Sequence, residues 1–133
     1  MEGVKIIQLS KVLDRRGNLS VIEEIKDIPF TIKRAYWIYD VPGGSDRGGH
    51  AYLKNKEFIV ALSGSFDVLL DNGREKEVFH LNRSYYGLLV ENRIWRQMIN
   101  FSTNSLAFIV SSEDYDVSDY IRDYDLFKKE YAR

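Results

Sequence analysis

The stretch GSDRGGHAYLKNKEFIVALSG, residues 44–64, decides the fold of this chain. It begins in a glycine-rich loop, where Gly48-Gly49 lets the backbone pass at a place that a side chain would block. Residues i and i+2 of a strand project to the same face, so His50 and Tyr52 are expected to point the same way. In a small barrel that shared face can be the interior, where a ligand binds. The stretch therefore predicts a strand on which a histidine and a tyrosine share one face, which would be the ligand-binding interior if the fold is a barrel.

Length and charge set the limits around this stretch. The chain has 133 residues, which predicts a single domain over 1–133. Lys plus Arg number 19 and Asp plus Glu number 20, so the net charge of −1 offers no footprint for nucleic acid. There is no cysteine, which excludes disulfides, thiolate metal sites and a cysteine nucleophile. No apolar run approaches the ~18 residues needed to span a bilayer. The N-terminus MEGVKIIQLSKVLD lacks a signal-peptide pattern, so no membrane and a cytoplasmic location are expected.

Short segments rich in β-branched and aromatic residues recur along the chain, separated by polar or glycine-bearing turns at intervals of roughly 8–12 residues. This rhythm is typical of an all-β sandwich or barrel. Asp71-Asn72-Gly73 is the clearest hairpin turn, because Asn and Gly tolerate the positive φ that a tight turn needs. The predicted strands are 18–25, 31–41, 57–64, 65–73, 74–81, 85–91, 93–99 and 104–112.

One helix is predicted near the C-terminus, over about 117–131, with Asp116 or Ser118 as its cap. Its aromatic residues recur at steps of four, three and four, which places them in one stripe on a helix. We interpret the stripe as a packing surface, either on the barrel or on a partner subunit. Its members are Tyr120, Tyr124, Phe127 and Tyr131.

The spacing Gly44-x5-His50-x-Tyr52-x4-Glu57-x6-Gly64 resembles the first signature of the cupin superfamily. That signature carries a second histidine where this chain has Tyr52. The resemblance implies an all-β fold, the cupin-type double-stranded β-helix, or jelly-roll barrel, with the one C-terminal helix added to it.

A second cupin signature usually supplies a further histidine, followed by an asparagine. The matching place in this chain has Arg96 at the histidine position and keeps Asn100. Of the usual metal-binding set only His50 and Glu57 remain, and an arginine cannot ligate a cation. A metal-dependent cupin is therefore the weakest interpretation, and no metal or other cofactor is expected.

The resemblance narrows further to the WxcM-like, or FdtA/QdtA-type, sugar 3,4-ketoisomerases, and it extends over essentially the whole chain. Members of this family move the keto group of dTDP-4-keto-6-deoxyglucose from C4 to C3, for deoxyamino sugars of surface polysaccharides. The family implies a nucleotide-sugar substrate and a homodimer with exchanged N-terminal strands. The matching segments are RGGHA (47–51), FIVALSGSFDVLLDNG (58–73), Trp95 and DYIRDY (119–124) followed by Phe127.

The residues suit keto migration, which needs a proton taken from the carbon beside a carbonyl, an enediol, and a proton returned to the next carbon. A histidine titrates near neutral pH and is a natural base for this, so His50 is the predicted catalytic base. Tyr52 stands where the family has its second catalytic histidine. It would act as a proton donor, or as a base if nearby arginines lower its pKa.

Six further residues are candidate substrate contacts through the same resemblance. Arg16 and Arg47 are candidate partners of the diphosphate, because a guanidinium grips phosphate oxygens in a bidentate way. Arg16 and Arg96 also stand where family subtypes with different C4 products differ. Tyr36 would line the pocket or relay a proton, and Glu57 would hold His50 or form a pocket wall. Asn100 completes the set.

Two other interpretations stay open at this stage. A cupin that binds a nucleotide sugar but has lost catalysis with its second histidine fits the same residues. Each candidate also has a structural alternative, with Tyr36 and Tyr52 as core residues and Glu57 as an ordinary strand carboxylate.

Overall fold

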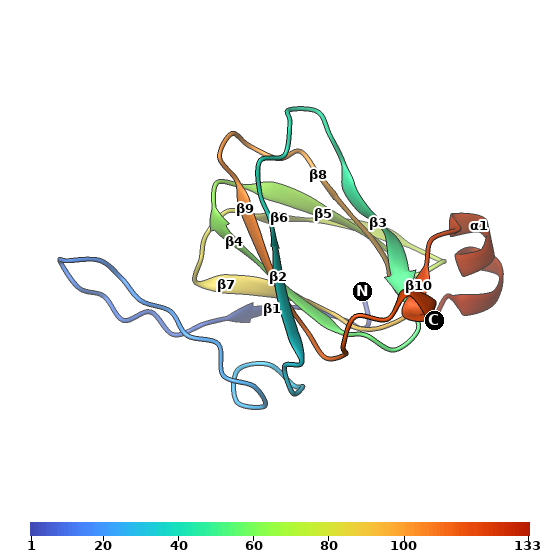
Figure 1. The fold of residues 1–133 in the computed structure, drawn as a ribbon, viewed down its shortest axis with the longest axis horizontal. Helices are drawn as coiled ribbons and strands as arrows, with labels where there is room; N and C mark the ends of the chain where they lie inside the picture. The colour runs from blue at the N-terminus through green and yellow to red at the C-terminus, as the bar shows by residue number, and fades with distance from the viewer.

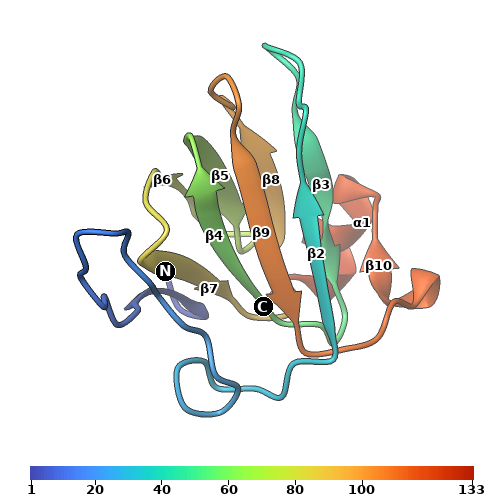
Figure 2. The ribbon, with the colours of Figure 1, turned by 60° about the vertical axis from the view of Figure 1, so that its left-hand side comes forward.

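Ten strands form two antiparallel sheets in the computed structural model, which describes residues 1–133. The first sheet has the order β1-β7-β4-β9-β2 and the second the order β10-β3-β8-β5-β6. Strands that follow each other in the chain often lie in opposite sheets, as β2 and β3 do, and this is the jelly-roll arrangement. Figures 1 and 2 show the two sheets facing each other as the walls of the barrel, with α1 outside it beside β3. The predicted all-β, cupin-type fold is confirmed.

The first sheet consists of β1 (Val4–Gln8), β7 (Tyr86–Val90), β4 (Glu57–Ser63), β9 (Leu106–Ser111) and β2 (Arg34–Ile38). The second consists of β10 (Tyr120–Ile121), β3 (Arg47–Tyr52), β8 (Trp95–Ile99), β5 (Phe66–Asp71) and β6 (Lys76–Leu81).

The core lies between the sheets and follows the two-residue period of the strands. Phe66, Val68 and Leu70 of β5 are fully buried and belong to one cluster of 12 buried residues. β4 is buried on both faces, because Phe58 and Val60 point away from that cluster into a second one. The second cluster covers the outer face of the first sheet. The barrel therefore has both a filled interior and one insulated outer face.

The strand predicted over 18–25 is absent, and this prediction was wrong. Only two isolated bridges form in this part of the chain, Val12 with Leu19 and Glu24 with Ile28. Ile25 has a φ of 67°, which no strand residue adopts. The segment after it contributes Ile28 and Phe30 to the second cluster. The apolar residues that cover the sheet thus follow the predicted strand, whereas Leu19 and Ile25 within it are 57% and 67% exposed.

Residues 10–20 form a hairpin arm that projects from the body of the molecule, blue in Figure 1. Val12, Leu13 and Leu19 of this arm are 56%, 72% and 57% exposed. Its tip is tied locally, because Arg16 binds the carboxylate of Asp14. The arm is thus an ordered element with apolar side chains that nothing in one chain covers.

The C-terminal helix is shorter than the predicted 117–131. A 3₁₀ turn, η1 (Val117–Asp119), capped by Asp116, is followed by β10. Helix α1 (Tyr124–Leu126) then begins at Asp123, which caps it, and continues as a π-helical turn, η2 (Phe127–Tyr131). β10 interrupts the predicted helix because Tyr120 and Ile121 pair with the free edge of β3.

The aromatic stripe on this helix is confirmed as a packing surface on the barrel. The ring centroids of Tyr124 and Phe127 lie 5.2 and 5.7 Å from that of Trp95. Tyr120 departs from the stripe, since it lies on β10 rather than on a helix. None of the helical segments has the length or apolar character needed to cross a lipid bilayer.

Candidate active site

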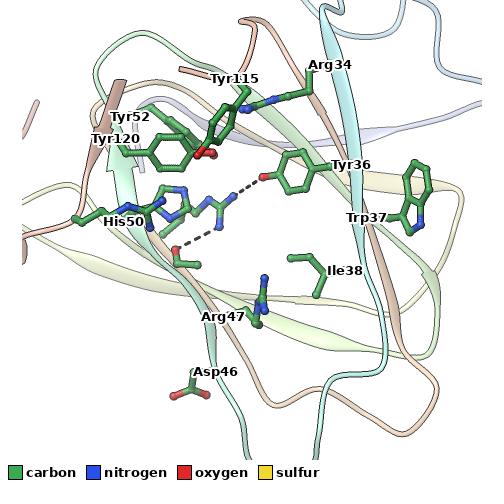
Figure 3. Close-up of a pocket in the computed structure, with 13 residues that line it drawn as sticks. Arg34, Tyr36, Trp37, Ile38, Asp46, Arg47, His50, Tyr52, Tyr115 and Tyr120 are labelled. Carbon is green, nitrogen blue, oxygen red and sulfur yellow. Dashed lines mark hydrogen bonds between the residues drawn. The ribbon is translucent and has the colours of Figure 1, made fainter. Parts of the chain in front are cut away.

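A cavity of about 610 Å³ opens along the edge where β2 of one sheet faces β3 and β10 of the other (Figure 3). Six of the residues that line it are aromatic or aliphatic, four are arginines, and one is an acid. The lining residues are Arg34, Tyr36, Trp37, Ile38, Asp46, Arg47, Gly48, His50, Tyr52, Arg96, Tyr115, Tyr120 and Arg122.

His50 is the buried basic group of this cavity. It lies on β3 opposite Arg96 of β8, and it is only 6% exposed. Its Nε2 is buried and has no hydrogen-bond partner, one of only two such side-chain atoms in the molecule. Burial, followed by the charges of Arg96, Arg122 and Arg34, lowers the pKa of His50 to about 2. The imidazole, which lines the cavity, is therefore neutral at physiological pH and has a nitrogen that no other group of the protein uses.

A buried ion pair forms the floor of the cavity. Nε and Nη2 of Arg96 lie 2.8 and 2.6 Å from Oε1 of Glu57, and both side chains are 2% exposed. Nη1 of Arg96 also donates to the carbonyl of Gly48, at 3.3 Å. Gly48 has a φ of 75°, and a side chain there would overlap this guanidinium. The prediction that Glu57 holds His50 is not what the structure shows, because Glu57 is bound to Arg96.

Two tyrosine hydroxyls converge on the other oxygen of Glu57. Tyr36 of β2 donates to Oε2 and accepts a hydrogen bond from Nη2 of Arg96 at 2.7 Å. Tyr52 donates to the same Oε2 at 3.3 Å. Burial raises the pKa of both phenols above the ordinary value, against the opposing charge of Arg96. Both tyrosines are consequently neutral proton donors.

The alternative in which arginines lower the pKa of Tyr52 and make it a base is therefore wrong. Burial and the nearby Glu57 carboxylate outweigh the effect of Arg96. The Tyr52 ring instead packs edge-on against the imidazole of His50, with centroids 4.7 Å apart. Tyr120 packs against both rings, at 4.9 Å from His50 and 4.7 Å from Tyr52. Tyr52 thus holds the histidine ring in place from one side.

Of the eight predicted site residues, six come together around this cavity. His50, Tyr52, Tyr36, Arg96 and Arg47 line it, and Glu57 lies directly behind them. The other two lie elsewhere in the chain.

Asn100 is exposed on the turn after β8, where its side chain donates to Asp67 at 2.8 Å. Its φ of 56° shows that it serves the turn, so the predicted substrate contact is not supported for Asn100. Arg16 sits at the tip of the projecting arm with 90% of its side chain exposed, and it lines no part of this chain's cavity. A single chain therefore does not bring Arg16 to its own site.

Sequence reasoning missed Arg34, Tyr115, Tyr120 and Arg122. A signal for Arg34 was present, because it precedes Tyr36 by two residues on one strand and so shares its face. The other three lie in the C-terminal segment, where the predicted helix concealed β10. The register of Tyr120 opposite Tyr52 carries them to the cavity.

The donor set around the cavity does not suit a metal ion. No group of three or more His, Cys, Asp or Glu side chains gathers anywhere in the structure. The guanidinium of Arg96 occupies the place opposite His50 and is itself cationic.

The jelly roll, with a cavity that opens between its two sheets, defines a cupin-type barrel. Residues 2–132 match the family model described as "WxcM-like, C-terminal", and the chain belongs to this family, as its sequence indicated.

Characterised relatives agree with this assignment. The chain is 43% identical over 129 residues to the TDP-4-oxo-6-deoxy-alpha-D-glucose-3,4-oxoisomerase of Aneurinibacillus thermoaerophilus, covering 97% of this chain and 93% of that protein. It superposes with a TM-score of 0.96 on the sugar 3,4-ketoisomerase QdtA of Thermoanaerobacterium thermosaccharolyticum in complex with TDP, at 34% identity over 98% and 96% of the two chains. Another structure of QdtA, with a histidine replaced by asparagine, holds TDP-4-keto-6-deoxyglucose. The WlaRB TDP-quinovose 3,4-ketoisomerase of Campylobacter jejuni gives a TM-score of 0.94 at 37% identity, over 98% of this chain and 100% of the other.

Proposed function

We propose that this chain is a cofactor-free sugar 3,4-ketoisomerase that moves the keto group of a TDP-4-keto-6-deoxyhexose from C4 to C3. The observation that carries the proposal is the imidazole of His50, which lines the cavity, is neutral and has a buried Nε2 without a hydrogen-bond partner. The activities of the relatives support the same reaction. The proposal includes a role in deoxysugar synthesis for surface polysaccharides. It also includes the cytoplasmic location that the sequence predicts.

His50 carries the carbon-bound proton. Its neutral Nε2 takes the proton from C3, and the electron pair of that bond forms the C3–C4 double bond of an enediolate. After that proton exchanges with solvent, the same nitrogen delivers a proton to C4. One base thus performs both steps, in agreement with the single histidine in the cavity.

Tyr36 carries the oxygen-bound proton. Its neutral hydroxyl, which donates to Oε2 of Glu57 in the free protein, would turn to donate to O4 as the enediol forms, and it later recovers a proton from O3. In between, the phenolate would face Nη2 of Arg96, which lies 2.7 Å from the hydroxyl oxygen and stabilises its charge. Glu57 fixes Arg96 from behind. Tyr52 has no proton to carry in this scheme and positions the ring of His50.

Proton exchange in deuterated water tests the reaction. With TDP-4-keto-6-deoxyglucose, the wild type is expected to form the 3-keto product with deuterium at C4, observed by NMR. His50→Asn should form none and still bind TDP in calorimetry. His80→Asn, which changes the exposed second histidine bound to Asp67, is the matched control and should remain active.

The alternative function is a binding module without catalysis, and the same measurements separate the two. TDP binding by the wild type with neither product nor deuterium uptake would establish that alternative. Full activity of His50→Asn would remove His50 as the base.

We also propose a homodimer in which the arm of one chain brings Arg16 to the partner's site, where Arg16 and Arg47 contact the substrate. Three features support it: the exposed apolar residues of the arm, the full exposure of Arg16, and the unpaired edge of β2. On β2, Trp37 is 57% exposed.

Light scattering should give a mass of about twice 15.6 kDa. A mixture of inactive His50→Asn and Arg16→Ala chains tests the exchange. If Arg16 serves the partner, random mixing restores roughly a quarter of the sites. A mixture that stays inactive, or a monomeric protein, would overturn the proposal.

A further inference from the structure

The imidazole of His50 is oriented by ring packing and by no hydrogen bond. A catalytic histidine usually donates one ring nitrogen to a carbonyl or a carboxylate, which fixes the orientation of the ring. In this structure no hydrogen bond reaches the imidazole, and its Nε2 is buried without a partner. Two tyrosine rings contact it instead, with centroids 4.7 Å away for Tyr52 and 4.9 Å away for Tyr120. The orientation of the proposed base therefore depends on these rings.

The three rings form one cluster, in which Figure 3 shows Tyr52 and Tyr120 together beside His50. The ring of Tyr52 lies at 82° to the imidazole and that of Tyr120 at 53°. The two tyrosine rings also contact each other, with centroids 4.7 Å apart. Since the χ2 torsion of a histidine has a broad intrinsic preference, such contacts decide where its nitrogens point. Rotation of the imidazole would require both tyrosines to move.

Strand pairing explains why Tyr120 reaches a histidine 70 residues earlier in the chain. Tyr120 of β10 lies directly opposite Tyr52 of β3, and opposite residues of an antiparallel pair share one face. His50 precedes Tyr52 by two residues and is therefore the diagonal neighbour of Tyr120 on that face. Aromatic side chains are long enough to contact a diagonal neighbour.

The neighbours of Tyr120 in the sequence hold β10 in this register. Asp119 is buried, and its carboxylate accepts from the backbone N–H of Lys54 at 2.7 Å and of Asn55 at 3.2 Å. Its carbonyl accepts from the N–H of Leu53 at 2.9 Å. Ile121, on the other side, is buried in the cluster around Trp95. A strand of two residues is thus fixed to the turn that follows β3.

The ring of Tyr120, rather than its hydroxyl, makes the close contacts of this side chain. The hydroxyl lies 3.4 Å from that of Tyr52, a long hydrogen bond. Cζ of Arg122 lies 4.5 Å from the ring centroid, so the ring contacts a guanidinium as well as the imidazole. The part of Tyr120 that acts on the site is therefore its aromatic surface.

We propose that Tyr120 is a second positioning residue of the site, and that its ring, together with that of Tyr52, holds the imidazole of His50 in the orientation that reaches the substrate. The inference rests on the proposed function, because it concerns the base of the same site. It gives the C-terminal segment, through β10, a part in catalysis although Tyr120 carries no proton.

Turnover of TDP-4-keto-6-deoxyglucose at saturating substrate gives the first test. Tyr120→Ala should lower kcat on the order of 10- to 100-fold, since a small misplacement of a catalytic group costs about this much. Tyr120→Phe keeps the ring and should restore kcat to near the wild-type value.

NMR of the imidazole nitrogens gives a second test, which needs no substrate. The chain has two histidines, and His80→Asn leaves the signals of His50 alone. In the wild type these signals should not titrate between about pH 5 and 8, because burial, followed by the charges of Arg96, Arg122 and Arg34, lowers the pKa of His50 to about 2.

In Tyr120→Ala, water reaches one side of the imidazole, and burial, the main cause of the low pKa of His50, is reduced. The signals should therefore shift and begin to titrate at a higher pH than in the wild type, whereas Tyr120→Phe should leave them unchanged. Tyr124→Ala is the matched control, because it removes a ring of the same segment that contacts Trp95 rather than His50. It should lower thermal stability and leave both kcat and the signals of His50 unchanged.

The outcomes separate this inference from the proposed reaction. If the signals of His50 are the same in Tyr120→Ala as in the wild type, or if Tyr120→Phe loses as much activity as Tyr120→Ala, the positioning role of the ring is overturned. If the signals respond as expected in a protein that turns over no ketosugar, the contact stands and the isomerase proposal fails. Should Tyr120→Ala unfold, Tyr120→Leu, which keeps apolar volume on β10 without a ring, carries the same test.

Discussion

The floor and the mouth of the cavity use the same residue types in opposite ways. On the floor, Arg96 is buried, paired with Glu57 and bound to Tyr36. At the mouth, Arg34 and Arg122 are stacked on tyrosines and have no acidic partner. A buried charge destabilises the fold unless the protein supplies an opposite charge. A charge at an open rim can remain unpaired until a ligand binds. The floor is thus fixed by bonds within the protein, whereas the charge at the mouth has no acidic partner there.

The largest effect is expected when one member of the buried ion pair on the floor is replaced. Glu57→Gln leaves the guanidinium of Arg96 buried and unpaired, which should lower the free energy of unfolding by about 3–5 kcal/mol. Urea denaturation measures it, with Glu75→Gln on the exposed β5–β6 turn as the control. A loss below about 1 kcal/mol would show that the pair is replaceable and that the floor is not held together by it.

Among the groups at the floor of the cavity, the hydroxyl of Tyr36 should matter most for catalysis. Tyr36→Phe removes the proposed proton carrier and should lower kcat about 10²- to 10⁴-fold, the usual contribution of a general acid–base group. Tyr52→Phe, which keeps the ring against His50, should cost far less. Steady-state assays on both variants test this, and equal losses would contradict the roles given to the two tyrosines.

Burial of His50 should appear as a pH dependence of stability. The unfolded chain takes up a proton below pH 6.5, whereas the native pKa of about 2 keeps the folded imidazole neutral. The contribution of His50 to the free energy of unfolding is therefore complete above pH 6.5. It falls by about 1.4 kcal/mol per pH unit as the pH drops below that value.

Denaturation of the wild type and of His50→Asn between pH 7 and 4.5 measures this slope as the difference between two curves. The difference should change steadily below pH 6.5. Parallel curves would mean that His50 is solvated and titrates normally.

The smallest effect is expected at the mouth. Arg122→Met and Tyr115→Phe alter exposed side chains that have no buried partners. Each should therefore change the free energy of unfolding by no more than about 0.5 kcal/mol in either direction. Thermal melts in the absence of nucleotide test this. A large loss in either variant would place the mouth among the structural parts of the molecule and blur its difference from the floor.

The sequence predicted most strands of the barrel. Alternation of apolar and polar residues between short turns indicates a half-buried strand without reference to distant residues. The prediction failed at 18–25, where the apolar residues find no partner strand: Leu19 and Ile25 are 57% and 67% exposed, and only isolated bridges form. It also merged η1, β10 and α1 into one helix, since the pairing of Tyr120 with Tyr52 is a long-range event.

For the site, the signature spacing gave His50, Tyr52, Glu57 and Arg96, which neighbouring strands bring together. It could not give the electrostatics, because the neutral state of His50 and of the tyrosines follows from burial. Arg16 and Asn100 show the limit of transfer by motif, since each lies outside the cavity of the chain that carries it.

Gly48 has a consequence for recognising this site in other sequences. Its backbone adopts a φ of 75°, and the guanidinium of Arg96 fills the space that a side chain at position 48 would need. A long cationic side chain at one position thus requires the smallest residue at the other, although 48 residues separate them. The two positions should therefore change together as a linked pair. In related sequences, two features together should indicate a cavity floor that contains a buried ion pair. They are a glycine two residues before the first signature histidine and an arginine at the histidine position of the second signature.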